Sequence, residues 1–296
     1  MIIKYFTMTK HIIPVALAVF AMLAVACGPA RVTVTSQSGY KFPAVAQGGK
    51  TAIVAHRGFW KCEAGGNSQN SIAALKAAQD NGLWGSECDL QLTKDGVVIV
   101  NHNDEIDGLY IRNHEWSELS THLLPNGERR PTIDEYLDQT AKCKTTKLII
   151  EFKEQKEQAK EDELVDKTFA AIKAHRLDDP ERVLFISFSK HICEKVAAEH
   201  PQYVNQFLTS RKAEENLPTN FEKLGINGVD YHYNVFRRHP DWVENAHKAG
   251  MSVNAWTVDK KSDINAMIEL GLDQITSNEP LLVRELLKDK EYRLAK

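Results

Sequence analysis

Residues 84–101 read WGSECDLQLTKDGVVIVN and contain two strand-like runs joined by a tight turn. One run includes residues 87–92, the other is VVIVN at 97–101, and Asp95-Gly96 lies between them. An Asp-Gly pair is a strong signal for an antiparallel hairpin. We therefore expect 97–101 to be a hairpin insertion that follows its partner strand, and not a further strand of the main sheet.

Short apolar runs alternate with helix-period segments along the rest of the chain. The strand candidates lie at 51–56, 84–89, 147–152, 182–187, 203–207, 226–230, 251–256 and 273–276. The helical segments lie at 68–80, 155–175, 189–199, 239–249, 260–270 and 280–290. This alternation predicts an α/β fold, a (β/α)8 TIM barrel with a small hairpin insertion after the second strand. A doubly wound open sheet is the alternative, but it usually has a glycine-rich phosphate loop after its first strand, where this chain has His56-Arg57-Gly58.

The composition is that of an ordinary globular protein, since 43% of the 296 residues are hydrophobic and 26% are charged. A net charge of −3 without a basic run argues against nucleic acid as a partner. We expect three parts: a signal peptide over 1–26, a tether over 27–50 and a single catalytic barrel domain over 51–296. The composition leaves the oligomeric state open.

The first 26 residues have the features of an export signal. Residues 1–11 are basic without an acid, and residues 12–26 form an apolar run that is short for a membrane-spanning helix. The run ends in LAVAC at 23–27, which resembles a bacterial lipobox, where the cysteine is lipidated. We expect an exported lipoprotein, anchored to a membrane through Cys27, in the periplasm or on the cell surface. An ordinary cleaved signal is the alternative.

The four other cysteines do not form a zinc pattern. They are Cys62, Cys88, Cys143 and Cys193. Disulfide pairing and free buried thiols both remain open, because connectivity cannot be deduced from spacing.

Acidic residues end the second and third predicted strands, and in a TIM barrel the carboxyl ends of the strands form the active site. Glu87 and Asp89 are two residues apart and so point to the same side of their strand, and Glu151 ends the next one. Three carboxylates at one mouth repel each other unless a cation joins them, and oxygen ligands favour Mg²⁺ or Ca²⁺. One such divalent cation would join the three carboxylates, and the spacing alone leaves this possibility open. Separate salt bridges with Arg57 and Lys153 are the alternative.

Two of the eleven histidines lie where such a site can use them. His56 ends the first strand, and His102 follows the hairpin insertion, which we expect to fold back over the barrel mouth. Two imidazoles can act as base and acid on opposite sides of a reacting centre. Because Arg57 and Lys153 suit phosphate oxygens, the whole set indicates phosphoester chemistry.

At the level of motifs, the chain resembles the glycerophosphodiester phosphodiesterase family. The shared motifs are AHRG at 55–58, ECDLQLTKDGVVIVNHND at 87–104, IIEFK at 149–153, FISFS at 185–189, VNAWTVD at 253–259 and GLDQITSNEP at 271–280. They fall in family order across nearly all of 51–280. The resemblance implies a TIM barrel that hydrolyses a small-molecule glycerophosphodiester to glycerol 3-phosphate and an alcohol.

The resemblance also implies a role for individual residues. The catalytic acid/base pair would be His56 and His102. The ligands of one divalent cation would be Glu87, Asp89 and Glu151. The substrate and phosphate contacts would be Arg57, Lys153 and Trp256, with plain barrel packing as the alternative for Trp256. One histidine would take a proton from the glycerol hydroxyl, the other would protonate the leaving alcohol, and water would then open a cyclic phosphate.

One stretch departs from the family pattern. The family has Pro-Glu-Asn-Thr where this chain has SQNS at 68–71, so that Gln69 keeps the shape of the glutamate but not its charge. The segment 59–67 is also unusual, and we expect it to shape substrate entry.

Two other functions remain as alternatives. A phospholipase C- or D-like enzyme would act on intact lipids and need an apolar rim, whereas the loop 106–130 is mostly polar and favours a water-soluble diester. The second alternative is a surface lipoprotein that binds a phosphorylated ligand without hydrolysing it.

Overall fold

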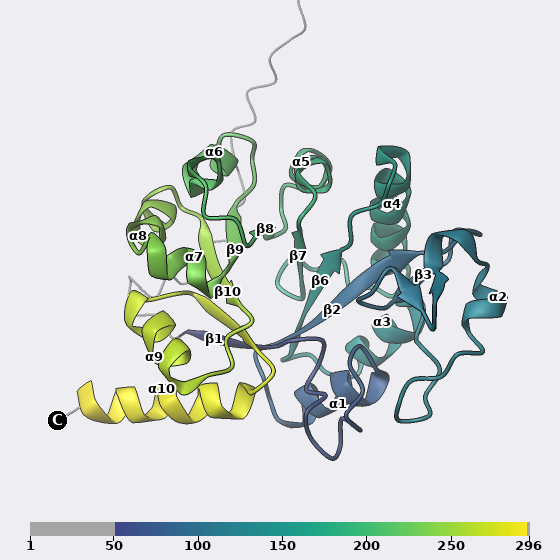
Figure 1. The fold of residues 1–296 in the computed structure, drawn as a ribbon, viewed down its shortest axis with the longest axis horizontal. Helices are drawn as coiled ribbons and strands as arrows, with labels where there is room; N and C mark the ends of the chain where they lie inside the picture. The colour runs from purple at the N-terminus through teal and green to yellow at the C-terminus, as the bar shows by residue number, and fades with distance from the viewer. Residues whose placement is uncertain (1–50, 295–296) are drawn as a thin grey trace, which may run out of the picture. The chain divides into compact units, whose positions relative to one another are not determined.

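A computed structural model describes residues 51–294, with side chains described over 51–289. In this part of the chain, parallel strands form a closed barrel with helices on its outside (Figure 1). The barrel strands are β1 (Ala52–Ala55), β2 (Gly85–Leu92), β6 (Lys147–Phe152), β7 (Val183–Ser187), β8 (Asn205–Thr209), β9 (Gly228–His232), β10 (Ser252–Trp256) and β11 (Gln274–Ser277). Strand β1 pairs with β2 on one side and with β11 on the other, which closes the cylinder.

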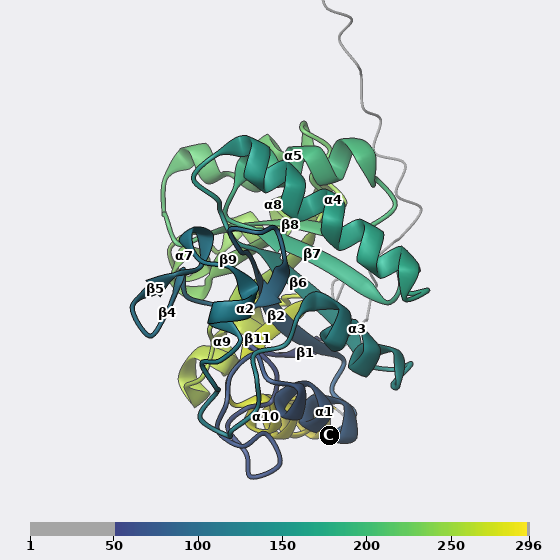
Figure 2. The same ribbon diagram turned by 90° about the vertical axis from the view of Figure 1, so that its right-hand side faces the viewer.

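The TIM barrel predicted from the sequence is therefore confirmed, with strands near the predicted places, although β2 runs to Leu92, three residues beyond its predicted end. Strands β8 and β9 each end two residues later than the apolar runs indicated, at Thr209 and His232. The outer helices are α1 (Ile72–Asp80), α3 (Ile133–Ala141), α4 (Gln158–Ala174), α5 (Lys190–Glu199), α6 (Pro218–Glu222), α7 (Tyr233–Arg238), α8 (Asp241–Lys248), α9 (Lys261–Leu270) and α10 (Pro280–Leu294). Figure 2 shows helices on both sides of the central strands.

Helix α1 begins later than the predicted segment, because Ser71 caps it. The Ser71 hydroxyl accepts a hydrogen bond from the amide of Ala74, so that residues 68–70 stay free to form a loop at the barrel mouth. Helix α3 is one that the apolar periodicity did not predict. A capping box marks its start, in which Thr132 and Glu135 each bond to the other's backbone amide.

Alternate residues of each strand face opposite sides of the barrel wall. Cys88 and Phe152 are fully buried in the cluster that packs against the helices, as the spacing predicts. Ile149, on the other face of β6, packs with Val54 and Leu184 inside the barrel. The two acidic positions of β2 and the one of β6 therefore belong to the inner face.

The hairpin insertion is also confirmed. Strand β3 (Val98–Val100) pairs antiparallel with β2, with Leu90 opposite Val100. After it come β4 (Glu105–Ile106), β5 (Leu109–Tyr110), a short 3₁₀ turn and α2 (Trp116–Leu119). These segments have an apolar cluster of their own, formed by Ile99, Ile106, Ile111 and Leu119. The backbone amide of Asn101 donates to the carbonyl of Asp89, which ties the end of β3 to the barrel mouth.

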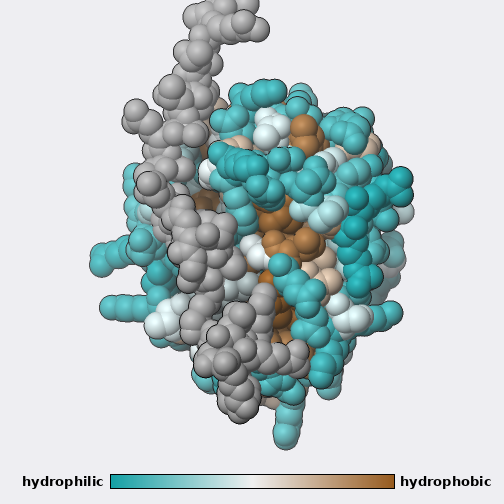
Figure 3. All heavy atoms as spheres, turned by 90° about the vertical axis from the view of Figure 1, so that its left-hand side faces the viewer, coloured by the Kyte–Doolittle hydropathy of each residue, from teal (hydrophilic) through white to brown (hydrophobic). Residues whose placement is uncertain are grey.

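Figure 3 shows the face at the left of Figure 1, where a strip of apolar side chains lies among hydrophilic ones. Among the described residues, no helix is long and apolar enough to cross a membrane. The predicted signal over 1–26, the lipidation site Cys27 and the tether over 27–50 lie outside the described residues. The cysteines Cys62, Cys88, Cys143 and Cys193 are all free thiols, which answers the question that their spacing left open.

Candidate active site

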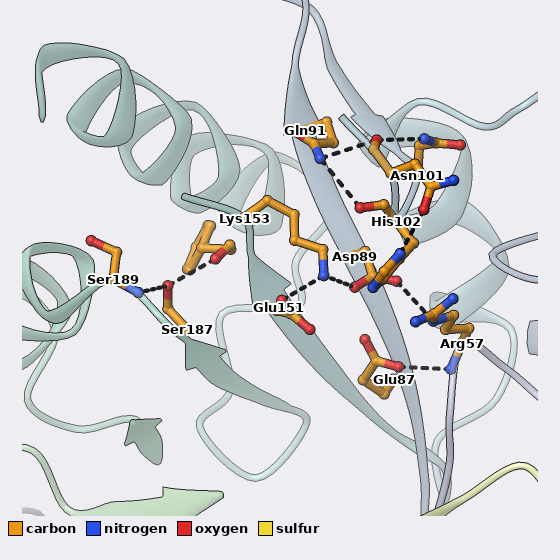
Figure 4. Close-up of polar contacts among 12 residues, drawn as sticks. Arg57, Glu87, Asp89, Gln91, Asn101, His102, Glu151, Lys153, Ser187 and Ser189 are labelled. Atoms are coloured by element: carbon orange, nitrogen blue, oxygen red, sulfur yellow. Dashed lines mark hydrogen bonds and ion pairs between the residues drawn. The ribbon is translucent and has the colours of Figure 1, made fainter. Parts of the chain in front are cut away.

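Three carboxylates lie together at the barrel mouth. Glu87 and Asp89 come from β2 and Glu151 from the adjoining β6, where Asp89 and Glu151 are register partners. One ligand oxygen of each lies within 4.8 Å of the others, and all three side chains are buried. Figure 4 shows them on neighbouring strands, directed into the same space. The convergence expected from the sequence is therefore present.

Burial of three acids in one place changes their protonation. Burial, together with Asp89 and Glu151, raises the pKa of Glu87 well above its usual value. Burial likewise raises the pKa of Glu151 to about 8. Burial would also raise the pKa of Asp89, but Lys153 and other nearby cations lower it below its usual value. Asp89 is therefore the carboxylate that stays charged without a metal ion.

Two basic side chains hold the cluster. Lys153 Nζ lies 2.8 Å from Asp89 Oδ1 and 2.6 Å from Glu151 Oε1 (Figure 4). Arg57 reaches the cluster in two ways, through its Nε 3.7 Å from Asp89 Oδ2 and through its backbone amide, which donates to Glu87 Oε2 at 2.7 Å. The ion pairs considered as an alternative to metal binding thus exist, but they leave oxygen atoms available.

The residues present fit a divalent cation. Glu87 Oε1 is buried and has no hydrogen-bond partner among the described residues, an arrangement that costs free energy unless something binds the oxygen. The ligand set contains carboxylate oxygens only, which suits a hard cation such as Mg²⁺ or Ca²⁺ better than zinc. The cluster can therefore hold one divalent metal ion.

His56 lies beside the carboxylates and is held from the last strand of the barrel. Its Nδ1 lies 2.9 Å from Asn278 Oδ1, and the indole N–H of Trp60 donates to the same oxygen at 3.0 Å. The amide group of Asn278 donates to Asp259 Oδ2 at 2.8 Å. Because Asn278 Oδ1 can only accept, His56 Nδ1 carries the hydrogen and its Nε2 has a free lone pair. Burial and the nearby Arg57 lower the pKa of His56 to about 4, which keeps the ring neutral.

His102 enters the site from the end of the insertion. Its Nδ1 lies 2.9 Å from Asn103 Oδ1, and its backbone carbonyl accepts from Gln91 Nε2 at 3.4 Å. Burial lowers its pKa, while the Asp89 carboxylate opposes that change. The structure therefore brings both predicted imidazoles to the carboxylate cluster, one from β1 and one from the insertion.

The loop before α1 also belongs to the site. Arg57 Nη1 donates to Gln69 Oε1 at 2.6 Å, and Asn70 Nδ2 donates to Asp89 Oδ2 at 2.7 Å. Arg57 and Asn70 both have a left-handed backbone conformation, with φ of +56° and +58°. The stretch 68–71, where the chain departs from the family pattern, thus orients both a cation and a carboxylate.

Trp256 lies at the carboxyl end of β10, on the inner face. Its indole N–H donates to the carbonyl of Asp230 at 3.0 Å, and its ring packs edge-on against Phe188 and His232. It is partly exposed at the mouth and also packs with the inner barrel cluster. Trp256 therefore takes part in the packing inside the barrel, and its contact with substrate stays a prediction.

Sequence reasoning missed Asn278, Asp259 and Trp60 as site residues. Asp259 belongs to the motif VNAWTVD and Asn278 to GLDQITSNEP, so the motifs that carry the family resemblance already contained both residues. Their contact with His56 depends on closure of the barrel and could not be deduced from spacing along the chain.

Fold and site together define a TIM-barrel hydrolase with a carboxylate cluster suited to a divalent metal ion, flanked by two imidazoles and two basic side chains. The model of the glycerophosphoryl diester phosphodiesterase family matches residues 56–282, and the chain belongs to this family. This result confirms the resemblance, the fold and the enzyme class expected from the sequence.

Several known proteins are similar over most of their length. A glycerophosphodiester phosphodiesterase of Parabacteroides distasonis has a crystal structure with 34% identity and a TM-score of 0.77, covering 82% of this chain and 98% of that one. A glycerophosphodiester phosphodiesterase of Caldanaerobacter subterraneus is 26% identical over 253 residues, 81% of this chain and 98% of the relative. An Oleispira antarctica phosphodiesterase, solved with its product sn-glycerol-3-phosphate, shares the fold at 23% identity, with a TM-score of 0.68 and coverage of 82% and 99%.

Proposed function

We propose that this enzyme hydrolyses water-soluble glycerophosphodiesters to glycerol 3-phosphate and an alcohol. One observation carries the proposal: Glu87, Asp89 and Glu151 place oxygens within 4.8 Å of one another at a barrel mouth that two imidazoles share. Membership of the family and the product named for the Oleispira relative support the same reaction.

The position of each site residue indicates its role in the reaction. Arg57 and Lys153 would bind the phosphate oxygens and offset the charge that accumulates there. His56, neutral and with a free Nε2, can exchange a proton with a substrate oxygen, as His102 can from the side of the insertion. One imidazole would take the proton of the glycerol hydroxyl next to the phosphate, and the other would protonate the leaving alcohol. Water would then open the cyclic phosphate with the two roles reversed.

The carboxylates Glu87, Asp89 and Glu151 would hold the metal ion. When bound, Mg²⁺ or Ca²⁺ would supply positive charge beside the phosphate oxygens. Their shared space is buried and lined by oxygen ligands, which supports one hard cation over a soft one.

The test is the release of glycerol 3-phosphate from a panel of glycerophosphodiesters by the purified barrel domain. We expect release with Mg²⁺ or Ca²⁺, loss of release with a chelator, and recovery when the ion is restored. The Glu87→Ala variant should be inactive, while Glu63→Ala, an exposed acid outside the cluster, should retain activity. A wild-type protein that binds a glycerophosphodiester but releases no product would instead be a binding protein.

We also propose that the protein is exported and anchored through a lipid on Cys27. Support comes from the basic head, the short apolar run and the LAVAC sequence of residues 1–27. Full-length protein expressed in a bacterium should incorporate labelled fatty acid and sediment with membranes. The Cys27→Ser variant should lose the label, and equal labelling of both forms would contradict the proposal.

A further inference from the structure

A cavity lined by polar and charged residues lies where β2, the insertion and the segment after β6 meet, and it has no role in the chemistry described above. It has a volume of about 240 Å³. Its lining residues are Gln91, Asp104, Arg112, Glu154, Gln155 and Lys156. Sites for drug-sized ligands usually measure roughly 300–1,000 Å³, so a cavity of this size suits a smaller group.

The cavity is joined to the site through its lining. Gln91 follows Asp89 by two residues on β2, and its Nε2 donates to the backbone carbonyls of His102 and Asn103. Gln155 Nε2 donates to the carbonyl of Lys153 at 2.9 Å. Figure 4 shows Gln91 beyond His102 and Lys153 on the side away from Glu87. A group attached to a phosphate at Lys153 and His102 can therefore extend into the cavity.

The charged side chains of the lining are not equally available. Arg112 lies 3.5 Å from Asp104, so that these two largely satisfy each other. Glu154 and Lys156 are exposed, and neither has an ion-pair partner among the residues that the structure describes. Glu154 directly follows Lys153 in the chain and is the carboxylate of the lining that has no ion-pair partner among the described residues.

None of the described residues that line the cavity is aromatic. A quaternary ammonium has no N–H to donate, and proteins recognise it mainly with aromatic faces. A primary ammonium or a hydroxyl donates hydrogen bonds to carboxylate and amide oxygens, which this lining provides. The lining therefore suits a small head group that donates hydrogen bonds.

We propose that this cavity binds the leaving alcohol of the substrate and selects head groups with a primary ammonium or hydroxyls over choline, with Glu154 as the main acceptor. The inference rests on the proposed function and names the substrate class within it. Ethanolamine and choline carry the same charge. A difference in kcat/KM between their diesters therefore reports hydrogen bonding and not electrostatic attraction.

The test compares glycerophosphoethanolamine with glycerophosphocholine, using glycerol 3-phosphate release for both. We expect the wild-type kcat/KM to be about tenfold higher for the ethanolamine diester, the scale of one hydrogen bond to a charged group. Glu154→Gln should lower that value more than it lowers the value for the choline diester, because both cations lose the attraction of the negative charge but only the ammonium loses a charge-assisted hydrogen bond. Glu157→Gln, an exposed acid three residues further on and outside the lining, is the matched control and should change neither.

Three outcomes would overturn the subsite. Equal kcat/KM for the two diesters in the wild type, equal losses for both in Glu154→Gln, or the same shift in the Glu157→Gln control each contradict it while the proposed function stands. Failure of the wild-type enzyme to hydrolyse either diester would overturn the proposed function and the subsite together. Thermal unfolding of each variant, compared with the wild type, separates these outcomes from loss of folding.

Discussion

His56 Nδ1 and Asn278 Oδ1 meet at 2.9 Å although the two residues are 222 positions apart in the sequence. The contact exists because β1 pairs with β11 and closes the barrel. It sets the tautomer of the imidazole and directs the free lone pair of Nε2 away from Asn278. Asn278, which directly follows the last strand, thus orients His56, which directly follows the first strand.

This relationship predicts that Asn278→Ala lowers kcat roughly 10²-fold, the effect of a misplaced catalytic group, and changes KM by no more than about twofold. The measurement is a full kinetic profile on a soluble diester. Asn278→Asp should recover part of the loss, because its carboxylate can accept the same hydrogen bond. If KM rises in Asn278→Ala and kcat does not fall, Asn278 serves substrate binding instead.

Removing either imidazole should stop most of the turnover. We expect His56→Ala and His102→Ala each to reduce kcat by roughly 10²–10⁴, the usual contribution of a general acid or base. His114→Ala is the matched control, because this half-buried histidine lies outside the site and its ring Nδ1 bonds to the carbonyl of Tyr110. Near-normal turnover in both site variants would eliminate acid–base catalysis by these residues.

Stability should depend on pH and metal together. In the metal-free protein the pKa of Glu151 is raised from 4.5 to about 8, and that of Glu87 is also raised. A carboxyl with a raised pKa stabilises the fold fully below its unfolded value and loses that contribution as pH rises through the folded value. Without metal, the contribution of these two carboxyls to stability should therefore be lost as pH rises from about 4.5 to 8, whereas His56, whose pKa is lowered from 6.5 to about 4, favours folding as pH rises to about 6.5.

A bound cation needs the carboxylates charged, so its effect should have the opposite trend. We expect Mg²⁺ or Ca²⁺ to raise Tm more at pH 8 than at pH 5, and calorimetry in two buffers to show that binding releases protons. The Glu87→Gln variant should be more stable than the wild type at pH 8 without metal, and should lose most of the cation effect. A cation effect that is independent of pH would contradict the raised pKa values.

Gln69 should hold Arg57 in place while leaving the full positive charge of its guanidinium available to the substrate. Its Oε1 accepts from Arg57 Nη1 at 2.6 Å without neutralising the guanidinium. Gln69→Glu would add a negative charge there, and we expect KM for the anionic diester to rise about threefold to tenfold, the effect of a partly screened charge, with kcat nearly unchanged. Gln69→Met, which adds no charge, separates the electrostatic effect from lost positioning. An unchanged KM in Gln69→Glu at low salt would refute the idea.

Local sequence patterns predicted much of this protein. The alternation in ECD at 87–89 and EFK at 151–153 correctly placed the carboxylates on the face opposite Cys88 and Phe152, because strand periodicity decides which residues share a face. The Asp95-Gly96 turn likewise identified the insertion and so brought His102 to the mouth.

Other features could not be predicted from local patterns. Helices α6 and α7 are too short for a clear period of 3.6 residues, since they span only Pro218–Glu222 and Tyr233–Arg238. The partners of His56 come from distant segments, and their contact depends on the strand pairing that closes the cylinder. The cavity next to Gln91 likewise arises where the insertion and the loop after β6 meet.

The pairing of β1 with β11 also determines at which stage of its synthesis the enzyme becomes active. A ribosome makes His56 early and Asn278 more than two hundred residues later, so a growing chain holds an imidazole without the partner that orients it. Fragments that stop before Gln274 lack both the closing strand and this contact. Catalysis should therefore begin only after β11 and Asn278 have been made, and shorter translation products should leave phosphodiesters intact.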